Sequence, residues 1–194
     1  MEKRLYDCLE ISDLKDMLNK TKNLYAENPA YKIRLDNGKY KIFTHGEVRN
    51  MVDSLGTALI NLGLKGKRIA IIGENRYEWE IAYLSIYSQE ELIENGRKLI
   101  EQGHREFIDA KINPEEMNIM LCTSGTTSKS KVVALSHKNI CSNLMDIGSV
   151  LDINSNDTLL SILPIHHVFE CTVGFLFSLK KIKKIIDKCV LANV

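Results

Sequence analysis

The stretch Leu121-Cys-Thr-Ser-Gly-Thr-Thr-Ser-Lys-Ser-Lys131 joins a short apolar run to a dense group of hydroxyl side chains, one glycine and two lysines. The residues before it, 118–122, and those after it, 132–135, are apolar enough to predict two β-strands. A loop of small hydroxyl residues around Gly125 can aim backbone N–H groups and side-chain donors at one concave point. Such a point suits an anion, and Lys131 adds the positive charge that a polyphosphate would use.

Two established phosphate-binding patterns are excluded by the spacing. The Walker pattern needs a second glycine five positions after Gly125, where Ser130 stands, and no segment of the chain fits G-x-G-x-x-G. On composition alone, a polar surface linker between two strands remains an equal alternative, because serine, threonine and lysine often build such turns.

Outward from the loop, apolar periodicity and capping residues predict an alternation of helices and strands. We expect a short helix beginning at Ser12, a β-hairpin of 31–35 and 39–43, a helix from Thr44 to Gly63 with a Thr44/Glu47 capping box, a strand at 68–73, a helix at 77–87, a Ser136-capped helix, and a strand at 158–163 closed by Pro164. Strands followed by helices indicate a parallel sheet and therefore an α/β fold.

The alternation breaks after Tyr87. Ser88 and Glu91 form another capping box, in front of an apolar pattern that ends at Gly103, so one helix follows another with no strand between them. In a doubly wound fold each helix normally returns the chain to a new strand. We therefore hypothesise that a strand-bearing segment is absent between Tyr87 and Ser88.

Composition limits the classes of function. The 194 residues carry a formal net charge of +1, which provides no overall field for nucleic acid, and 44% of them are hydrophobic, which suits a globular core. The five cysteines are odd in number and form no C-x-x-C pair, which favours reduced thiols over disulfides or a zinc site. No signal-peptide pattern and no apolar run of about 18 residues occurs, so we predict a cytoplasmic protein without a transmembrane segment.

Three motifs resemble one enzyme family. Thr123-Ser-Gly-Thr-Thr-Ser-Lys-Ser-Lys131 resembles T-S-G-T-T-G-x-P-K-G, the phosphate-binding signature of the adenylate-forming enzymes, which include acyl-CoA synthetases, luciferases and peptide-synthetase adenylation domains. Leu163-Pro-Ile-His-His-Val-Phe-Glu170 is similar to the family's substrate-pocket motif. Ile72-Gly-Glu-Asn-Arg-Tyr-Glu-Trp79 resembles bacterial long-chain fatty acid–CoA ligases, and Ser136-His-Lys-Asn139 fits the same group. The resemblance spans roughly residues 10 to 179.

The resemblance implies a fold and an activity. Residues 1–179 would form a partial N-terminal AMP-binding domain of the adenylate-forming fold, a mostly parallel sheet with flanking helices and an N-terminal β-hairpin, and 180–194 a divergent basic tail. The activity would be that of an AMP-forming long-chain fatty acid–CoA ligase, which converts fatty acid, ATP and CoA through an acyl-adenylate. ATP, Mg²⁺ and CoA would be its cofactors, with the CoA site outside this chain, and ATP and a fatty acid its small-molecule substrates.

The resemblance also assigns roles to single residues. His167 would be catalytic, facing the carboxylate and the α-phosphate, although a histidine packed after Pro164 would explain the same residue in isolation. No residue is assigned as a protein ligand of a metal. The β- and γ-phosphates would be bound by Thr123, Ser124, Gly125, Thr126, Thr127 and Lys131.

Departures from the family keep two rivals open. Ser128 and Val132 replace glycines and Ser130 replaces a proline, and the family's adenine, ribose and catalytic-lysine segments are not found in the sequence. We therefore expect an incomplete, inactive fragment. The alternative is a non-catalytic remnant or binding protein without nucleotide affinity, and an unrelated kinase or ATPase is disfavoured by the absence of a Walker pattern.

The basic stretch from Lys180 to Lys188 predicts a solvated helix face and leaves peripheral contact with a membrane open. Open edges of the predicted sheet would favour self-association.

Overall fold

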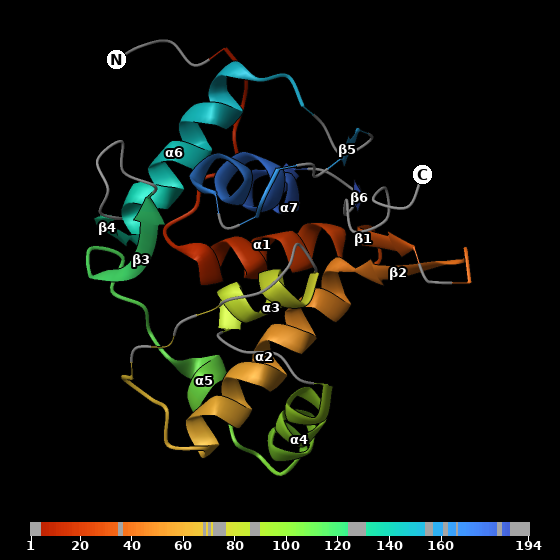
Figure 1. The fold of residues 1–194 in the computed structure, drawn as a ribbon, viewed down its shortest axis with the longest axis vertical. Coiled ribbons are helices and arrows are strands. Elements are labelled where there is room, and N and C mark those ends of the chain that lie inside the picture. Colours follow the sequence, from red (N-terminus) through yellow and green to blue (C-terminus); the bar gives the residue numbers. More distant parts are fainter. Residues whose placement is uncertain are drawn as a thin grey trace. The chain divides into compact units, whose positions relative to one another are not determined.

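The computed structural model describes residues 5–34, 37–67, 69, 71, 77–85, 90–123, 131–153, 157–160, 163–165, 167–181 and 184–186. The chain divides into two compact units, the first from residues 1–21 and 112–186 and the second essentially from residues 22–111. The elements in Figure 1 are α1 (Leu14–Tyr25), β1 (Pro29–Arg34), β2 (Tyr40–Thr44), α2 (His45–Asn61), α3 (Tyr77–Ser85), α4 (Glu90–Glu101), α5 (Glu106–Asp109), β3 (Met117–Thr123), β4 (Lys131–Ser136), α6 (His137–Val150), β5 (Thr158–Leu160), the π-helix η1 (Glu170–Phe177), α7 (Ser178–Lys181) and β6 (Lys184–Ile186).

In the first unit, strands β3 and β4 form an antiparallel hairpin. Their register pairs Cys122 with Val132 and Thr123 with Lys131, with one irregularity near Met117. Strand β4 leads directly into α6, and Ser136 caps that helix as the sequence predicts: the Asn139 N–H donates to the Ser136 hydroxyl at 3.2 Å, and the Asn139 side chain accepts from the Ser136 N–H at 3.0 Å.

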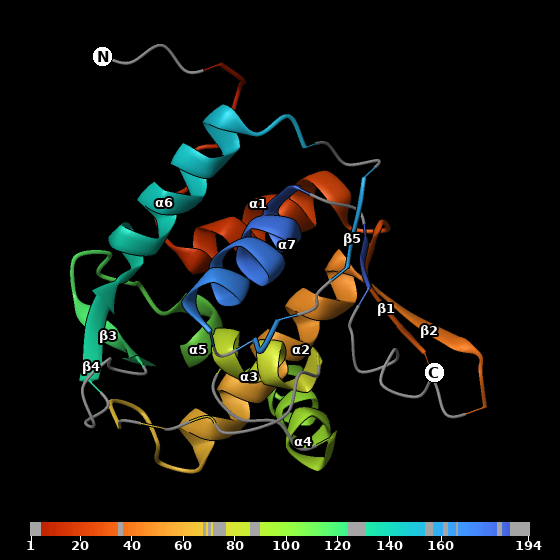
Figure 2. The same cartoon turned by 45° about the horizontal axis from the view of Figure 1, so that its top comes forward.

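The core of the first unit lies along α6 and η1, which pack against each other. Figure 2 shows the helical rod made of η1 and α7 beside α6. Their fully buried apolar side chains include Leu144, Phe175 and Phe177. Strands β5 and β6 pair in parallel, with Thr158 opposite Lys184. This pair is parallel, as expected for an α/β fold, whereas the β1–β2 and β3–β4 pairs are antiparallel, so the pairings among the described residues are not mostly parallel.

The second unit is built around α2. Its predicted capping box is confirmed, because the Thr44 hydroxyl accepts from the Glu47 N–H at 3.2 Å and the Glu47 carboxylate accepts from the Thr44 N–H at 2.7 Å. The chain leaves this helix through Gly63 with φ of 77°, as predicted. Strands β1 and β2 form the predicted antiparallel hairpin, with Tyr31 opposite Phe43.

Helix α4 packs on α2 at very close range. A Cβ atom placed on Gly96 would overlap the carbonyl group of Ser54, so the two helix backbones touch at this point. Gly96 therefore permits close contact between the two helices. Gly103 has another role, because it follows the end of α4 with φ of 93°, as the sequence predicts.

Several predicted segments fall partly outside the described residues. Of the strand expected at 68–73, only Ile69 and Ile71 are described, and neither is assigned to a strand. The expected helix-to-helix succession is found: α3 ends at Ser85 and α4 begins at Glu90, with 86–89 outside the described part.

The prediction of a solvated helix face from Lys180 to Lys188 is wrong where it can be compared. Lys180 is only 1% exposed, and Lys184–Ile186 forms strand β6. Alternation of charge along the chain cannot reveal burial by other elements, and a lysine stem of four methylenes packs readily against apolar surface.

Candidate functional site

The β3–β4 hairpin holds the two ends of the predicted phosphate loop together. Thr123 and Lys131 are directly opposite each other at the open end of the ladder, so the seven residues between them close a short connection. Of the predicted phosphate-binding residues, Thr123 and Lys131 have a described backbone, whereas Ser124, Gly125, Thr126 and Thr127 lie outside the described residues. A short loop anchored at both ends by a strand pair is a suitable frame for converging N–H groups.

Val132 stands where the family signature has a glycine. In the structure it is part of β4, opposite Cys122, and its side chain is 61% exposed. A β-branched residue is favoured in an extended strand, and its exposed side chain meets no steric barrier. The substitution is therefore compatible with the local backbone of the hairpin. The two other departures, Ser128 and Ser130, lie outside the described residues.

His167 lies on an exposed turn at the start of the helical segment that continues into η1. Its backbone N–H donates to the Pro164 carbonyl at 2.8 Å, and its carbonyl accepts from the Cys171 N–H at 2.9 Å. The ring nitrogen Nδ1 is 3.4 Å from the Phe169 N–H, so the imidazole orients toward the first turn of the helix. The structure thus holds the backbone of His167 firmly and keeps its side chain in contact with solvent.

The π-helix that follows His167 was not expected from the sequence. Single π turns occur often at functional sites, and η1 extends this geometry over Glu170–Phe177. Glu170 is 5% exposed, and a Cβ atom on Gly174 would overlap its carboxylate. Apolar periodicity cannot distinguish a π-helix from an α-helix over eight residues, so no pattern in the sequence predicts it.

His137, beside the end of β4, connects two elements of the first unit. Its Nδ1 accepts a hydrogen bond from the Leu14 N–H at 3.3 Å, which satisfies an N-terminal donor of α1. Burial lowers the pKa of His137 below 6.5, and the nearby Asp13 carboxylate partly opposes this shift. The neutral imidazole is therefore the form that the folded chain favours.

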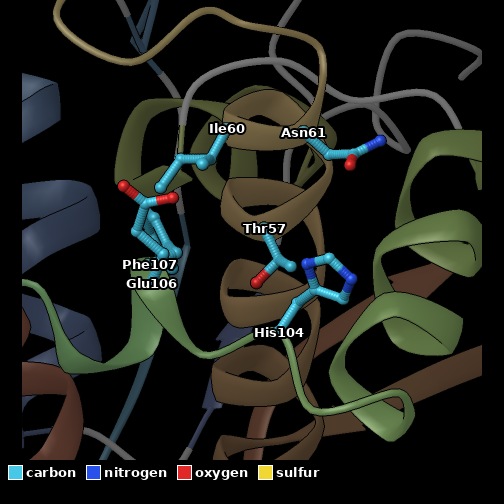
Figure 3. Close-up of a pocket in the computed structure, with 6 residues that line it drawn as sticks. All are labelled: Thr57, Ile60, Asn61, His104, Glu106 and Phe107. Atoms are coloured by element: carbon cyan, nitrogen blue, oxygen red, sulfur yellow. The ribbon is translucent and has the colours of Figure 1, made fainter.

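A pocket in the second unit is a separate feature. It has a volume of about 260 Å³ and opens between α2 and the segment around α5 (Figure 3). Thr57 on α2 already donates to the Asp53 carbonyl at 2.8 Å, and Glu106 pairs with Lys65. No predicted site residue lines this pocket, whose walls are formed by Thr57, Ile60, Asn61, His104, Glu106 and Phe107.

Two searches of the described residues bear on metals and membranes. No group of three or more histidine, cysteine, aspartate or glutamate residues there is arranged to hold a metal ion. No helix in that part of the chain has the length and apolar character needed to cross a bilayer.

Comparison with known proteins identifies a family. Residues 86–182, half of the chain, match the family model described as AMP-binding enzyme. An acyl-CoA ligase of Penicillium expansum is 28% identical over 136 residues, which is 70% of this chain and 26% of the relative. Long-chain-fatty-acid–CoA ligase 5 of Mus musculus is 24% identical over 230 aligned positions, covering 77% of this chain and 34% of the relative.

The solved structures agree on the fold. The N-terminal domain of FACL13 from Mycobacterium tuberculosis superposes with a TM-score of 0.72 at 16% identity, over 91% of this chain and 57% of that domain. The chain is therefore a partial N-terminal domain of the adenylate-forming fold. The chain spans only about a third or less of the two ligases that it matches.

Proposed function

The chain belongs to the AMP-binding enzymes, and we propose that it is part of an AMP-forming long-chain fatty acid–CoA ligase whose ATP phosphates are held by the Thr123–Lys131 loop. The single observation that carries this proposal is the β3–β4 register, which sets Thr123 opposite Lys131 inside the matched region 86–182. The name of the Mus musculus relative favours long-chain fatty acids as the carboxylate substrate.

The residues of the loop suit the phosphates of ATP chemically. Threonine and serine hydroxyls, backbone N–H groups and the Lys131 ammonium are hydrogen-bond donors, and phosphate oxygens are acceptors. Magnesium ions are usually bound together with nucleotide phosphates, so the proposal needs no protein cage for the metal. ATP would supply the adenylyl group that activates the fatty acid, with pyrophosphate as the leaving group.

For His167 we propose a position facing the fatty acid carboxylate and the α-phosphate. Two observations support the proposal. The side chain is exposed, and the backbone hydrogen bonds to Pro164 and Cys171 hold the main chain of His167 in place. An imidazole can donate a hydrogen bond to phosphate or carboxylate oxygens as negative charge shifts between them.

We also propose that residues 1–179 are a shortened AMP-binding domain with an internal gap near Tyr87 and Ser88, and that 180–194 diverge from it. The alignment with the mouse ligase supports the gap, because its 230 positions exceed the 194 residues of the whole chain. The relative therefore contains residues that have no counterpart here. Among the described residues, α4 is the next element after α3, which is in keeping with a gap at this point.

The proposal is tested by thermal unfolding of the purified chain with and without saturating Mg–ATP. A ligand that binds only the native state raises the unfolding midpoint by mass action. At a ligand concentration of about a hundred times Kd, it raises the free energy of unfolding by about 2.7 kcal/mol. We expect an upward shift in the wild-type chain and a much smaller one in Lys131→Ala.

Lys98→Ala is the matched control, because Lys98 is an exposed lysine of α4 whose removal changes the net charge by the same amount. Its midpoint should rise with Mg–ATP as in the wild type. A cooperative transition that Mg–ATP does not move would contradict phosphate binding by this loop.

A non-catalytic remnant is the second candidate, and the specific observation in its favour is the replacement of two signature glycines by Ser128 and Val132. The strand position of Val132 removes part of this objection, since no special backbone conformation is needed there. Restoring Ser128→Gly and Val132→Gly together should increase the Mg–ATP shift if loop conformation limits binding. An unchanged shift after this restoration, with none in the wild type, would favour the remnant.

A further inference from the structure

The N-terminal segment before α1 is fixed against the first unit. The N–H groups of Leu5 and Tyr6 both donate to the Ser149 carbonyl, at 3.1 and 3.2 Å, near the end of α6. These bonds hold the segment beside α6, and Cys8 contacts this helix at Gly148, the residue before Ser149. A Cβ atom on Gly148 would lie 2.7 Å from the Cys8 sulfur. Glycine at 148 therefore provides the space that the thiol occupies.

The sulfur of Cys8 faces an ammonium group. Lys180 on α7 directs its Nζ atom to within 3.0 Å of Cys8 Sγ. The other hydrogen-bond contact of this sulfur, to the Leu9 carbonyl, is 3.8 Å long and therefore weak. Lys180 is consequently the main polar partner of Cys8, although the two residues are 172 positions apart in the chain.

Burial makes this contact significant for Lys180. The residue is 1% exposed, and among the described residues its ammonium has no carboxylate within salt-bridge distance. A buried cation is costly without an anionic partner. The polar atom within reach is the Cys8 sulfur, which lies 3.0 Å from the ammonium nitrogen. Cys8 itself remains partly exposed, so reagents can reach it.

We propose that Cys8 is a modification site, a thiolate paired with the buried Lys180 ammonium that reacts with peroxides. In the reaction the sulfur attacks one peroxide oxygen, the O–O bond breaks and an S–O bond forms. Sulfur loses two electrons and becomes a sulfenic acid, while the leaving hydroxide takes a proton from solvent and departs as water. The peroxide is the oxidant, and no other co-reactant is needed.

Two other cysteines of the first unit act as internal references. Cys141 and Cys171 are 1% and 2% exposed. Burial raises the pKa of Cys141 to about 11, and the Asp13 and Asp16 carboxylates raise it further against the opposing effect of Lys180. Cys141 therefore stays a neutral thiol at physiological pH and is a poor nucleophile.

The experiment treats the purified full chain with hydrogen peroxide near pH 7, traps sulfenic acid with dimedone, and measures the rate at each cysteine by peptide mass spectrometry. We expect Cys8 to react faster than Cys141 and Cys171. In Lys180→Met, which keeps an apolar stem without the charge, the Cys8 rate should fall about tenfold, because an ordinary thiol is only a few per cent thiolate at pH 7.

Lys180→Arg keeps a cation and should preserve most of the rate, whereas Cys8→Ser should abolish the Cys8 adduct. The pH midpoint of iodoacetamide labelling at Cys8 should be higher in Lys180→Met than in the wild type, which a purely structural role would not produce. Circular dichroism checks that each variant is folded. If Lys180→Met does not fold, the ranking of Cys8 over Cys141 in the wild type and in Lys180→Arg decides. Equal rates at Cys8 and Cys141, or a folded Lys180→Met with the wild-type Cys8 rate, would overturn the proposal.

Discussion

His137 shows how one side chain can make the stability of the first unit depend on pH. Its Nδ1 must be unprotonated to accept the hydrogen bond from Leu14 at 3.3 Å. Burial, the main cause, lowers its pKa in the folded chain below the ordinary value of 6.5, against a smaller opposing effect of Asp13. The folded state therefore binds fewer protons than the unfolded state in the pH range between the two pKa values.

We predict that the free energy of unfolding falls as the pH drops from about 6.5 through the folded pKa of His137. Above 6.5 both states carry a neutral imidazole, so the contribution of His137 is fully present and constant. Urea unfolding at several pH values between about 7.5 and 5 measures the change.

The matched variant is His137→Asn, whose side-chain oxygen can accept from the Leu14 N–H without titrating. Subtracting its pH profile from that of the wild type isolates the effect of His137. Identical profiles in the two proteins would show that this histidine does not control stability.

Single residues also mark where sequence interpretation fails. The lysine-rich stretch after Leu179 predicts solvent exposure, yet Lys180 is 1% exposed and contacts Cys8. Neither the burial nor the partner is visible in the sequence, because the contact joins the two ends of the first unit. Lysine burial depends on distant packing, and a local charge pattern contains no information about it.

Among the elements, helix starts are the most predictable features, because a cap involves residues three apart. The Thr44/Glu47 box and the Ser136 cap were both expected and both are found. The antiparallel β3–β4 pair could also have been expected, since a loop as short as 124–130 cannot return the chain for parallel pairing. The π-helix could not, because it depends on packing around Glu170 and Gly174.

The contact between α2 and α4 leads to a prediction whose sign is informative. In an exposed helix position, replacing glycine by alanine stabilises by up to about 1 kcal/mol. At Gly96 the added methyl group would overlap the Ser54 carbonyl, and such overpacking destabilises a folded protein by about 1 to 3 kcal/mol. Gly96→Ala should therefore lower the free energy of unfolding measured by urea denaturation.

The control is Asn95→Ala, one residue earlier on the exposed face of α4, where alanine should be neutral or slightly stabilising. The pair separates helix propensity from helix packing. A stabilised Gly96→Ala protein would mean that α4 does not pack on α2 at this distance.

For the whole molecule, local patterns identified the family fold but not its organisation. The phosphate-loop motif predicted an adenylate-forming domain, and the TM-score of 0.72 with the FACL13 N-terminal domain confirms that fold. The division of the chain into units 1–21 with 112–186 and 22–111 was not expected. Such a division depends on which helices bury each other's apolar faces, and an amphipathic pattern does not specify its partner.

The last prediction separates nucleotide binding from catalysis. The chain spans 34% of the mouse ligase and has no residues opposite part of the aligned region. The proposed phosphate loop by itself offers hydrogen-bond donors for the phosphates of ATP. Binding energy for phosphates alone does not lower a barrier whose transition state also needs the adenine, ribose and carboxylate held in position.

We expect purified chain mixed with palmitate, ATP, Mg²⁺ and CoA to form no acyl-CoA and release no pyrophosphate above background, even where Mg–ATP raises the unfolding midpoint. Liquid chromatography with mass spectrometry measures both products, with an intact long-chain ligase as the positive control. Acyl-CoA formation that disappears in Lys131→Ala would contradict this expectation and would assign catalysis to this chain itself.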